Sequence, residues 1–84
     1  MLDSIQGSKN WIMVPTAPLR ELMDSRYPRE SAYEKGQRLG ISRSSYQRIN
    51  TNDIMTYIRA DRYAVRLGLH PVNIWADWYE ITTR

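Results

Sequence analysis

The sequence predicts an all-α fold, a compact bundle of about five short helices. Apolar residues recur at spacings of three and four in several segments, which is the period of an amphipathic helix. Ser, Thr, Pro and Gly stand at the borders of those segments, where helices begin and end. No segment shows the convincing apolar–polar alternation of a strand. With 84 residues, the chain has room for one small domain.

Residues 1–15 are expected to form an N-terminal arm before the bundle. The first ten residues are polar and lack periodicity. The apolar run 11–14, which Pro15 stops, is too short for a helix and favours an extended segment that packs Trp11 against the domain. An arm that reaches along a ligand or a partner subunit is the alternative.

The first helix is expected between Thr16 and Pro28. Thr16 or Ala17 can cap its start, and Pro18 lies at or near its first position, where the missing N–H costs nothing. Its apolar stripe has the spacing i, i+3, i+4: Leu19, Leu22 and Met23. This stripe provides a floor on which later helices can pack.

Two short helices joined by a tight turn are expected over residues 31–51. Ser31 and Glu34 form a capping box, in which each side chain satisfies a backbone amide at the start of the first of these helices. The inward-facing residues of that helix have the spacing i, i+4, i+7: Ala32, Gly36 and Leu39.

The second of the two helices follows the glycine turn 39–42. Ser42 caps it, and Tyr46 and Ile49 face inward at a spacing of three. Four polar side chains then share its outer face: Arg43, Ser44, Gln47 and Arg48. Two short helices around a glycine, with such a face on the second, are typical of a helix-turn-helix.

A longer helix is expected to follow the cap cluster 50–53 and to end at Leu67, before Gly68. Asn52 and Thr56 can each cap its start, and Gly68 suits the position after its end. Its expected buried residues are apolar: Ile54, Tyr57, Ile58, Ala64, Val65 and Leu67.

A short last helix is expected to start at Pro71, with His70 as its cap. It would continue through three apolar residues: Ile74, Trp75 and Trp78. Residues 16–80 would thus form one domain, followed by a tail at 81–84.

Positive charge is concentrated around the two-helix motif. Residues 29–66 carry eight basic and four acidic side chains, an excess of +4, whereas residues 1–28 are neutral and residues 67–84 carry −1. Seven of the eight bases are arginines, which bind phosphate and guanine through two hydrogen bonds. A solvated helical surface explains so small a charge by itself, but its coincidence with the motif favours a polyanionic partner.

Composition excludes several other classes of protein. The chain has no cysteine, so a disulfide framework or a thiolate metal site is excluded and a reducing cytoplasm is favoured. No apolar run is long enough to span a membrane, and the N-terminus lacks the layout of a signal peptide. His70, the one histidine, has no second ligand and no catalytic elbow near it in sequence. We therefore expect a cytoplasmic protein (in a bacterium or an infected host cell) without enzymatic activity, metal or other cofactor.

Over residues 16–78 the chain resembles the lambda-repressor-like (Xre/Cro-type) helix-turn-helix DNA-binding domains. Gly36 stands where these domains have a small residue, residues 39–41 match their turn, and residues 42–49 match the helix after it. Residues 60–75 are similar to the last two helices of such domains in actinobacteria and their phages.

The resemblance implies that the helix at 42–50 lies in the major groove of double-stranded DNA. Base edges would be read by Arg43 at guanine, by Gln47 at adenine and by Ser44. Six further residues would bind phosphates: Lys35, Arg38, Ser42, Arg48, Asn50 and Asn52. The chain departs from the family at Lys35, where an apolar side chain is usual.

The expected function is that of a sequence-specific transcriptional regulator, similar to a phage Cro protein or repressor. It would bind as a monomer or as a homodimer joined through Trp75, Trp78 or the arm with Trp11. An excisionase (recombination directionality factor) or an antitoxin is the alternative within the DNA-binding class. In a different class, the helix-turn-helix would serve only as the scaffold of a protein-binding module.

Overall fold

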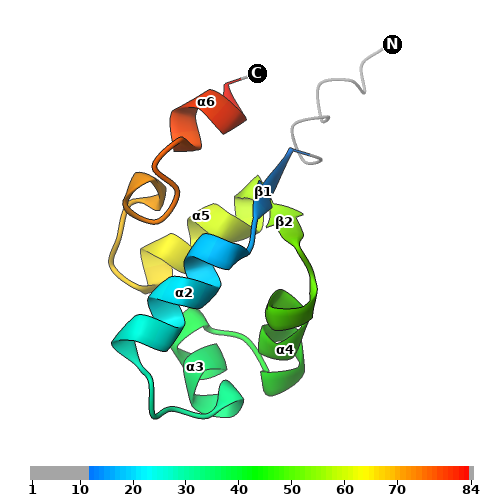
Figure 1. Cartoon of the computed structure of the whole chain (residues 1–84), viewed down its shortest axis with the longest axis vertical. Coiled ribbons are helices and arrows are strands. Elements are labelled where there is room, and N and C mark those ends of the chain that lie inside the picture. Colours follow the sequence, from blue (N-terminus) through cyan, green and yellow to red (C-terminus); the bar gives the residue numbers. More distant parts are fainter. Residues whose placement is uncertain (1–11, 84) are drawn as a thin grey trace.

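The computed structural model describes residues 12–83, which fold into five α-helices, one 3-10 helix and one two-stranded sheet. The elements in chain order are β1 (Met13–Pro15), α2 (Ala17–Arg26), α3 (Ala32–Leu39), α4 (Arg43–Thr51), β2 (Ile54–Thr56), α5 (Tyr57–Arg66), η2 (Pro71–Asn73) and α6 (Trp78–Thr82). In Figure 1, α2 and α5 cross the centre, α3 and α4 lie together at one end, and α6 lies at the other. The fold is mostly helical, as expected, but it is not purely α-helical. Among the described residues no helix is long and apolar enough to cross a membrane.

The sheet is a correction to the all-α prediction. β1 and β2 pair antiparallel with Val14 opposite Met55, and both of these side chains are buried. Each strand has three residues, which is too short to show the alternation that identifies a strand in sequence. Residues 13–15 therefore belong to the folded domain and not to an arm. Residues 1–11 of the expected arm, Trp11 among them, and Arg84 of the tail lie outside the described residues.

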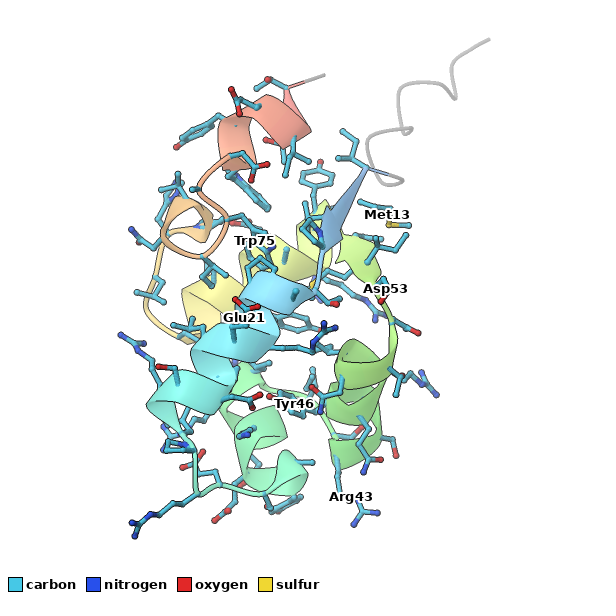
Figure 2. All side chains as sticks on the ribbon, in the orientation of Figure 1. Met13, Glu21, Arg43, Tyr46, Asp53 and Trp75 are labelled. Carbon is cyan, nitrogen blue, oxygen red and sulfur yellow. The ribbon has the colours of Figure 1, made fainter. Side chains whose placement is uncertain are left out.

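The core lies between α2 and α5 and receives side chains from both ends of the molecule. Leu19 and Met23 of α2 are fully buried, as their spacing predicts, and Leu22 is half-buried. The remaining members come from every other α-helix, from both strands and from the segment between η2 and α6: Val14, Leu39, Tyr46, Ile49, Met55, Ala60, Tyr63, Trp75 and Trp78. Figure 2 shows Trp75 and Tyr46 on opposite sides of α2, one toward the α6 end and one toward the α3–α4 end.

Helix α5 starts later than one of its two possible caps suggests, and it buries a different face. Thr56 is the cap, since its Oγ1 accepts a hydrogen bond from Arg59 N, and Ile54 lies in β2 instead. The buried residues of α5 are Ala60, Tyr63 and Ala64. The expected burial of Ile54, Ile58 and Val65 is wrong, because these side chains are exposed on the sheet and on the other face of α5. Two alanines on the inward face allow close packing that the larger residues would prevent.

The chain after Gly68 contains two short helices where we expected one. Gly68 adopts φ +75° after α5, as expected for a residue that ends a helix. His70 caps η2, because its Nδ1 accepts a hydrogen bond from Val72 N at 3.1 Å. α6 then begins at Trp78 and extends to Thr82, so the first part of the expected tail is helical.

Trp75 and Trp78 belong to the core and not to a subunit interface. They are 1% and 7% exposed, and Trp75 Nε1 donates a 2.7 Å hydrogen bond to the carbonyl oxygen of Pro15. This bond ties the C-terminal segment to β1. Side chains buried this deeply offer little surface to a second subunit.

Candidate nucleic-acid interface

Helix α3 has the start and the end that its sequence predicts. Ser31 Oγ accepts a hydrogen bond from Glu34 N at 3.2 Å, and Glu34 Oε1 accepts one from Ser31 N at 2.8 Å. Gly40 ends the helix in the left-handed region, with φ +76°, which favours glycine. The capping box and the glycine turn are both confirmed.

Gly36 lies where α3 meets the segment that leads into α4. A Cβ atom at this position would lie 3.0 Å from the carbonyl oxygen of Ile41 and 3.1 Å from that of Ser42. Both are backbone atoms, so they cannot move aside as a side chain could. The absent side chain of Gly36 therefore sets how closely α3 approaches the start of α4.

Helix α4 is fixed at its start and along its inner face. Ser42 is its cap, with Oγ accepting a 3.2 Å hydrogen bond from Ser45 N. Tyr46 and Ile49 are 1% and 7% exposed and belong to the core. The predicted division between an inner and an outer face of α4 is confirmed.

The outer face of α4, hereafter the reading face, consists of Arg43, Ser44, Gln47 and Arg48. All four are exposed, and none of their side chains has a hydrogen-bond or ion-pair partner among residues 12–83. Figure 2 shows Arg43 pointing away from the body of the molecule at the start of α4, opposite in sense to Tyr46. The three residues expected to read bases thus lie on one accessible helix face, together with Arg48.

The two cations of α3 are paired within the chain. Lys35 Nζ lies 2.7 Å from Asp24 Oδ1 of α2, and the Lys35 side chain is 13% exposed. This pair explains how a lysine occupies a position where the resembling family has an apolar residue: its aliphatic part is covered and its ammonium group reaches an acid.

Arg38 is paired as well. It donates hydrogen bonds of 2.7 and 2.6 Å to the two carboxylate oxygens of Glu30, and its guanidinium lies 3.8 Å from the centre of the Tyr27 ring. These hydrogen bonds lower the pKa of Glu30 and raise that of Arg38. A phosphate at Lys35 or Arg38 would have to compete with a carboxylate, so these two residues are weaker phosphate ligands than their sequence positions suggest.

The end of α4 is held by α2 through a residue to which the sequence assigns no role. Arg20 Nη1 lies 2.6 Å from Thr16 Oγ1, 3.3 Å from the carbonyl oxygen of Ile49 and 3.2 Å from that of Asn52. Thr16 Oγ1 also donates a 2.6 Å hydrogen bond to the Asn52 carbonyl. Because these partners are 29 to 36 residues apart, no local sequence signal could have identified them.

Two of the other expected phosphate ligands have exposed side chains, and a third caps α4. Asn50 and Asn52 are exposed near the end of α4, and the recorded contact of Asn52 with α2 uses its main chain and not its side chain. The Ser42 hydroxyl is engaged in capping, with Ser45 Oγ 3.2 Å away. The structure therefore groups Arg48 with the reading face and distributes the other five around it.

No protein-family model matches the chain, and neither curated proteins nor solved structures gave a significant match.

Proposed function

We propose that this protein binds double-stranded DNA in a sequence-specific manner, places α4 in the major groove and thereby regulates transcription. One observation carries the proposal: the four polar side chains of the reading face are exposed and have no partner within residues 12–83, while the opposite face of the same helix is buried. Two arginines, a glutamine and a serine make up this face of the nine-residue helix, and these are side chains that contact base edges and phosphates.

The chemistry of the reading face suits base edges. Arginine donates two hydrogen bonds to guanine O6 and N7, and glutamine pairs with adenine N6 and N7, which assigns these roles to Arg43 and Gln47. Ser44 is short enough to accept or donate at either base. Arg48, farther along the helix, is placed to contact a phosphate and so to fix the register.

Firm attachment of α4 supports the same proposal, because recognition requires side chains held in fixed positions. Ser42 fixes the start of the helix, Tyr46 and Ile49 fix its inner face, and Arg20 fixes its end. A repressor of the Cro type, an excisionase and an antitoxin would all use this face in the same way. The sequence and position of the bound site distinguish these three.

A protein-binding scaffold is the second candidate, and the outer face of the sheet favours it. Met13 and Ile54 are 43% and 54% exposed there, and the nearby Ile58 of α5 is also exposed. Large exposed apolar side chains that gather in one place are a common sign of a protein interface.

Selection from a pool of random duplexes in moderate salt, followed by sequencing, tests the proposal. The wild-type protein is expected to enrich one short motif, and a folded Arg43→Ala/Gln47→Ala variant is expected to lose that enrichment. Recovery of no motif by the wild type, together with a stoichiometric protein partner, would favour the scaffold.

A further inference from the structure

Helices α4 and α5 enclose a groove, hereafter the arginine groove, that flanks the reading face. It consists of two hollows of about 420 and 270 Å³ that share Ser45, Arg59 and Tyr63 in their walls. The larger hollow extends to the Gly40 turn, and the smaller one extends past Asn52 to the sheet. The two hollows adjoin at the three shared residues along the side of α4.

Four arginines line this groove, and its walls contain no acidic residue. Arg48 comes from α4, and the other three come from α5: Arg59, Arg62 and Arg66. The spacing i, i+3, i+7 places the three α5 arginines on one face of their helix. All four are exposed, and none has an ion-pair partner among the described residues.

Arg66 lies directly over the turn between α3 and α4. A Cβ atom at Gly40 would collide with the Arg66 guanidinium, so the glycine also leaves room for this side chain. The first turn of α4, whose helix dipole is positive at that end, begins just beyond. Positive charge is therefore unbalanced around the start of α4, in contrast to the paired Lys35 and Arg38 on α3.

We infer that the arginine groove binds the sugar–phosphate backbone of one DNA strand beside the bases that α4 reads. This inference rests on the proposed function, and it adds three arginines of α5 to the expected phosphate ligands. Arg62 and Arg66 are the principal ligands in the larger hollow, and Arg59 and Arg48 continue the contact along the smaller one.

The shape of the groove favours an extended strand over a single small anion. Arg59 and Arg66 are seven residues apart, about 10 Å along the helix axis. Along the axis of a duplex, where each strand rises about 3.4 Å per nucleotide, this length corresponds to about three nucleotides. The four arginines are also spread over two adjoining hollows, whereas a single phosphate would need converging ligands at one point.

The salt dependence of duplex binding measures the contact. Each phosphate contact contributes about −0.9 to the slope of log K against log salt concentration. The Arg62→Gln/Arg66→Gln variant is therefore expected to flatten the slope by about 2 and to weaken binding equally at all sequences, because phosphates carry no base identity. The selected motif should remain unchanged.

Two comparison variants distinguish the effect of the groove arginines on the slope from the effect of net charge. Arg62→Lys/Arg66→Lys keeps both charges and is expected to keep the wild-type slope. Arg26→Gln removes an exposed charge at the end of α2, outside the groove walls, and is expected to leave the slope within error of the wild type. Circular dichroism shows that each variant is folded.

An unchanged slope and affinity in Arg62→Gln/Arg66→Gln, with motif selection by the wild type intact, would overturn the groove inference alone. Failure of the wild type to bind any duplex would overturn the proposed function and the groove together. Binding of inorganic pyrophosphate to the wild type that duplex DNA does not displace would also overturn the inference, in favour of a small-anion site.

Discussion

Gly36 and Lys35 are adjacent residues that determine how α3 packs. Gly36 brings α3 against the carbonyl groups of Ile41 and Ser42. The side chain of Lys35 instead reaches α2, where it pairs with Asp24. An apolar residue at 35 and an alanine at 36 would be more usual in a helix-turn-helix of the resembling family. In this chain, Gly36 lets α3 approach the turn closely, and Lys35 forms an ion pair with Asp24 in place of an apolar contact.

Gly36→Ala is expected to lower the free energy of unfolding by about 1–2 kcal/mol. Overpacking against backbone costs about 1–3 kcal/mol, and the higher helix propensity of alanine returns about 0.5–1 kcal/mol. Urea unfolding measures the difference. Gly68→Ala is the comparison, because Gly68 has φ +75° but no atom within 4 Å of an added Cβ and so reports backbone strain alone. A Gly36→Ala protein more stable than the wild type would contradict the close approach.

Tyr46 carries the one buried side-chain oxygen or nitrogen without a hydrogen-bond partner among residues 12–83. Burial, and to a smaller extent the Asp24 carboxylate, raises the pKa of Tyr46 from 10.0 to about 12. The Tyr46 hydroxyl therefore ionises at a lower pH in the unfolded chain than in the folded one. The stability that Tyr46 contributes is fully present below pH 10 and is lost as pH rises from about 10 to 12.

Tyr46→Phe is expected to remove the fall in unfolding free energy that Tyr46 causes between about pH 10 and 12. At pH 7 the same change should leave stability equal or higher, since an unpaired buried hydroxyl costs about 1–3 kcal/mol. Unfolding free energies of both proteins at pH 7, 10 and 11.5 measure the two effects. An identical pH dependence in the two proteins would show that the Tyr46 hydroxyl is not buried as described.

At the scale of elements, α4 is held at both of its ends by polar contacts. Ser42 holds its start by a local cap, and Arg20 and Thr16 of α2 hold its end over a long sequence separation. The end of α4 leads directly into β2, which pairs with β1. Arg20 thus positions both the last turn of the reading helix and the entry to the sheet.

Arg20→Met is expected to destabilise the protein by about 1–3 kcal/mol, because three acceptors, two of them on the buried residues Thr16 and Ile49, lose a charged donor. Faster amide exchange should be confined at first to the last turn of α4 and to β2. Arg26→Met on the same helix is exposed and is expected to change stability by less than about 0.5 kcal/mol. Equal effects of the two substitutions would contradict the role assigned to Arg20.

Local signals predict the helices well, and contacts between distant residues explain what they miss. Ser31, Ser42 and Gly68 mark helix ends through bonds to near neighbours, and these ends are confirmed. The strands have three residues each and exist through pairing across some forty positions, so no local pattern reveals them. The same limit applies to the candidate site. The reading face follows from the period of α4, whereas Arg20 and the arginine groove depend on how α4 packs against α2 and α5.

At the scale of the whole molecule, charge is divided between two sides of the helix-turn-helix. On the α3 side, Lys35 and Arg38 are neutralised by Asp24 and Glu30. On the α5 side, the arginines of the groove have no acid in the walls around them. A modest net charge of +3 therefore coexists with a strongly positive strip beside α4. A polyanion bound along this strip would hold α4 in the same orientation relative to itself on every encounter.

The most direct test of the central claim is the ratio of affinities for the selected duplex and for a mixed-sequence duplex of equal length. It is measured at one salt concentration for the wild type and for folded Arg43→Ala/Gln47→Ala. Since each bidentate base contact contributes about 1–3 kcal/mol, the ratio is expected to fall at least tenfold in the variant, with nonspecific binding largely retained. A variant that keeps the wild-type ratio would show that α4 does not read the DNA.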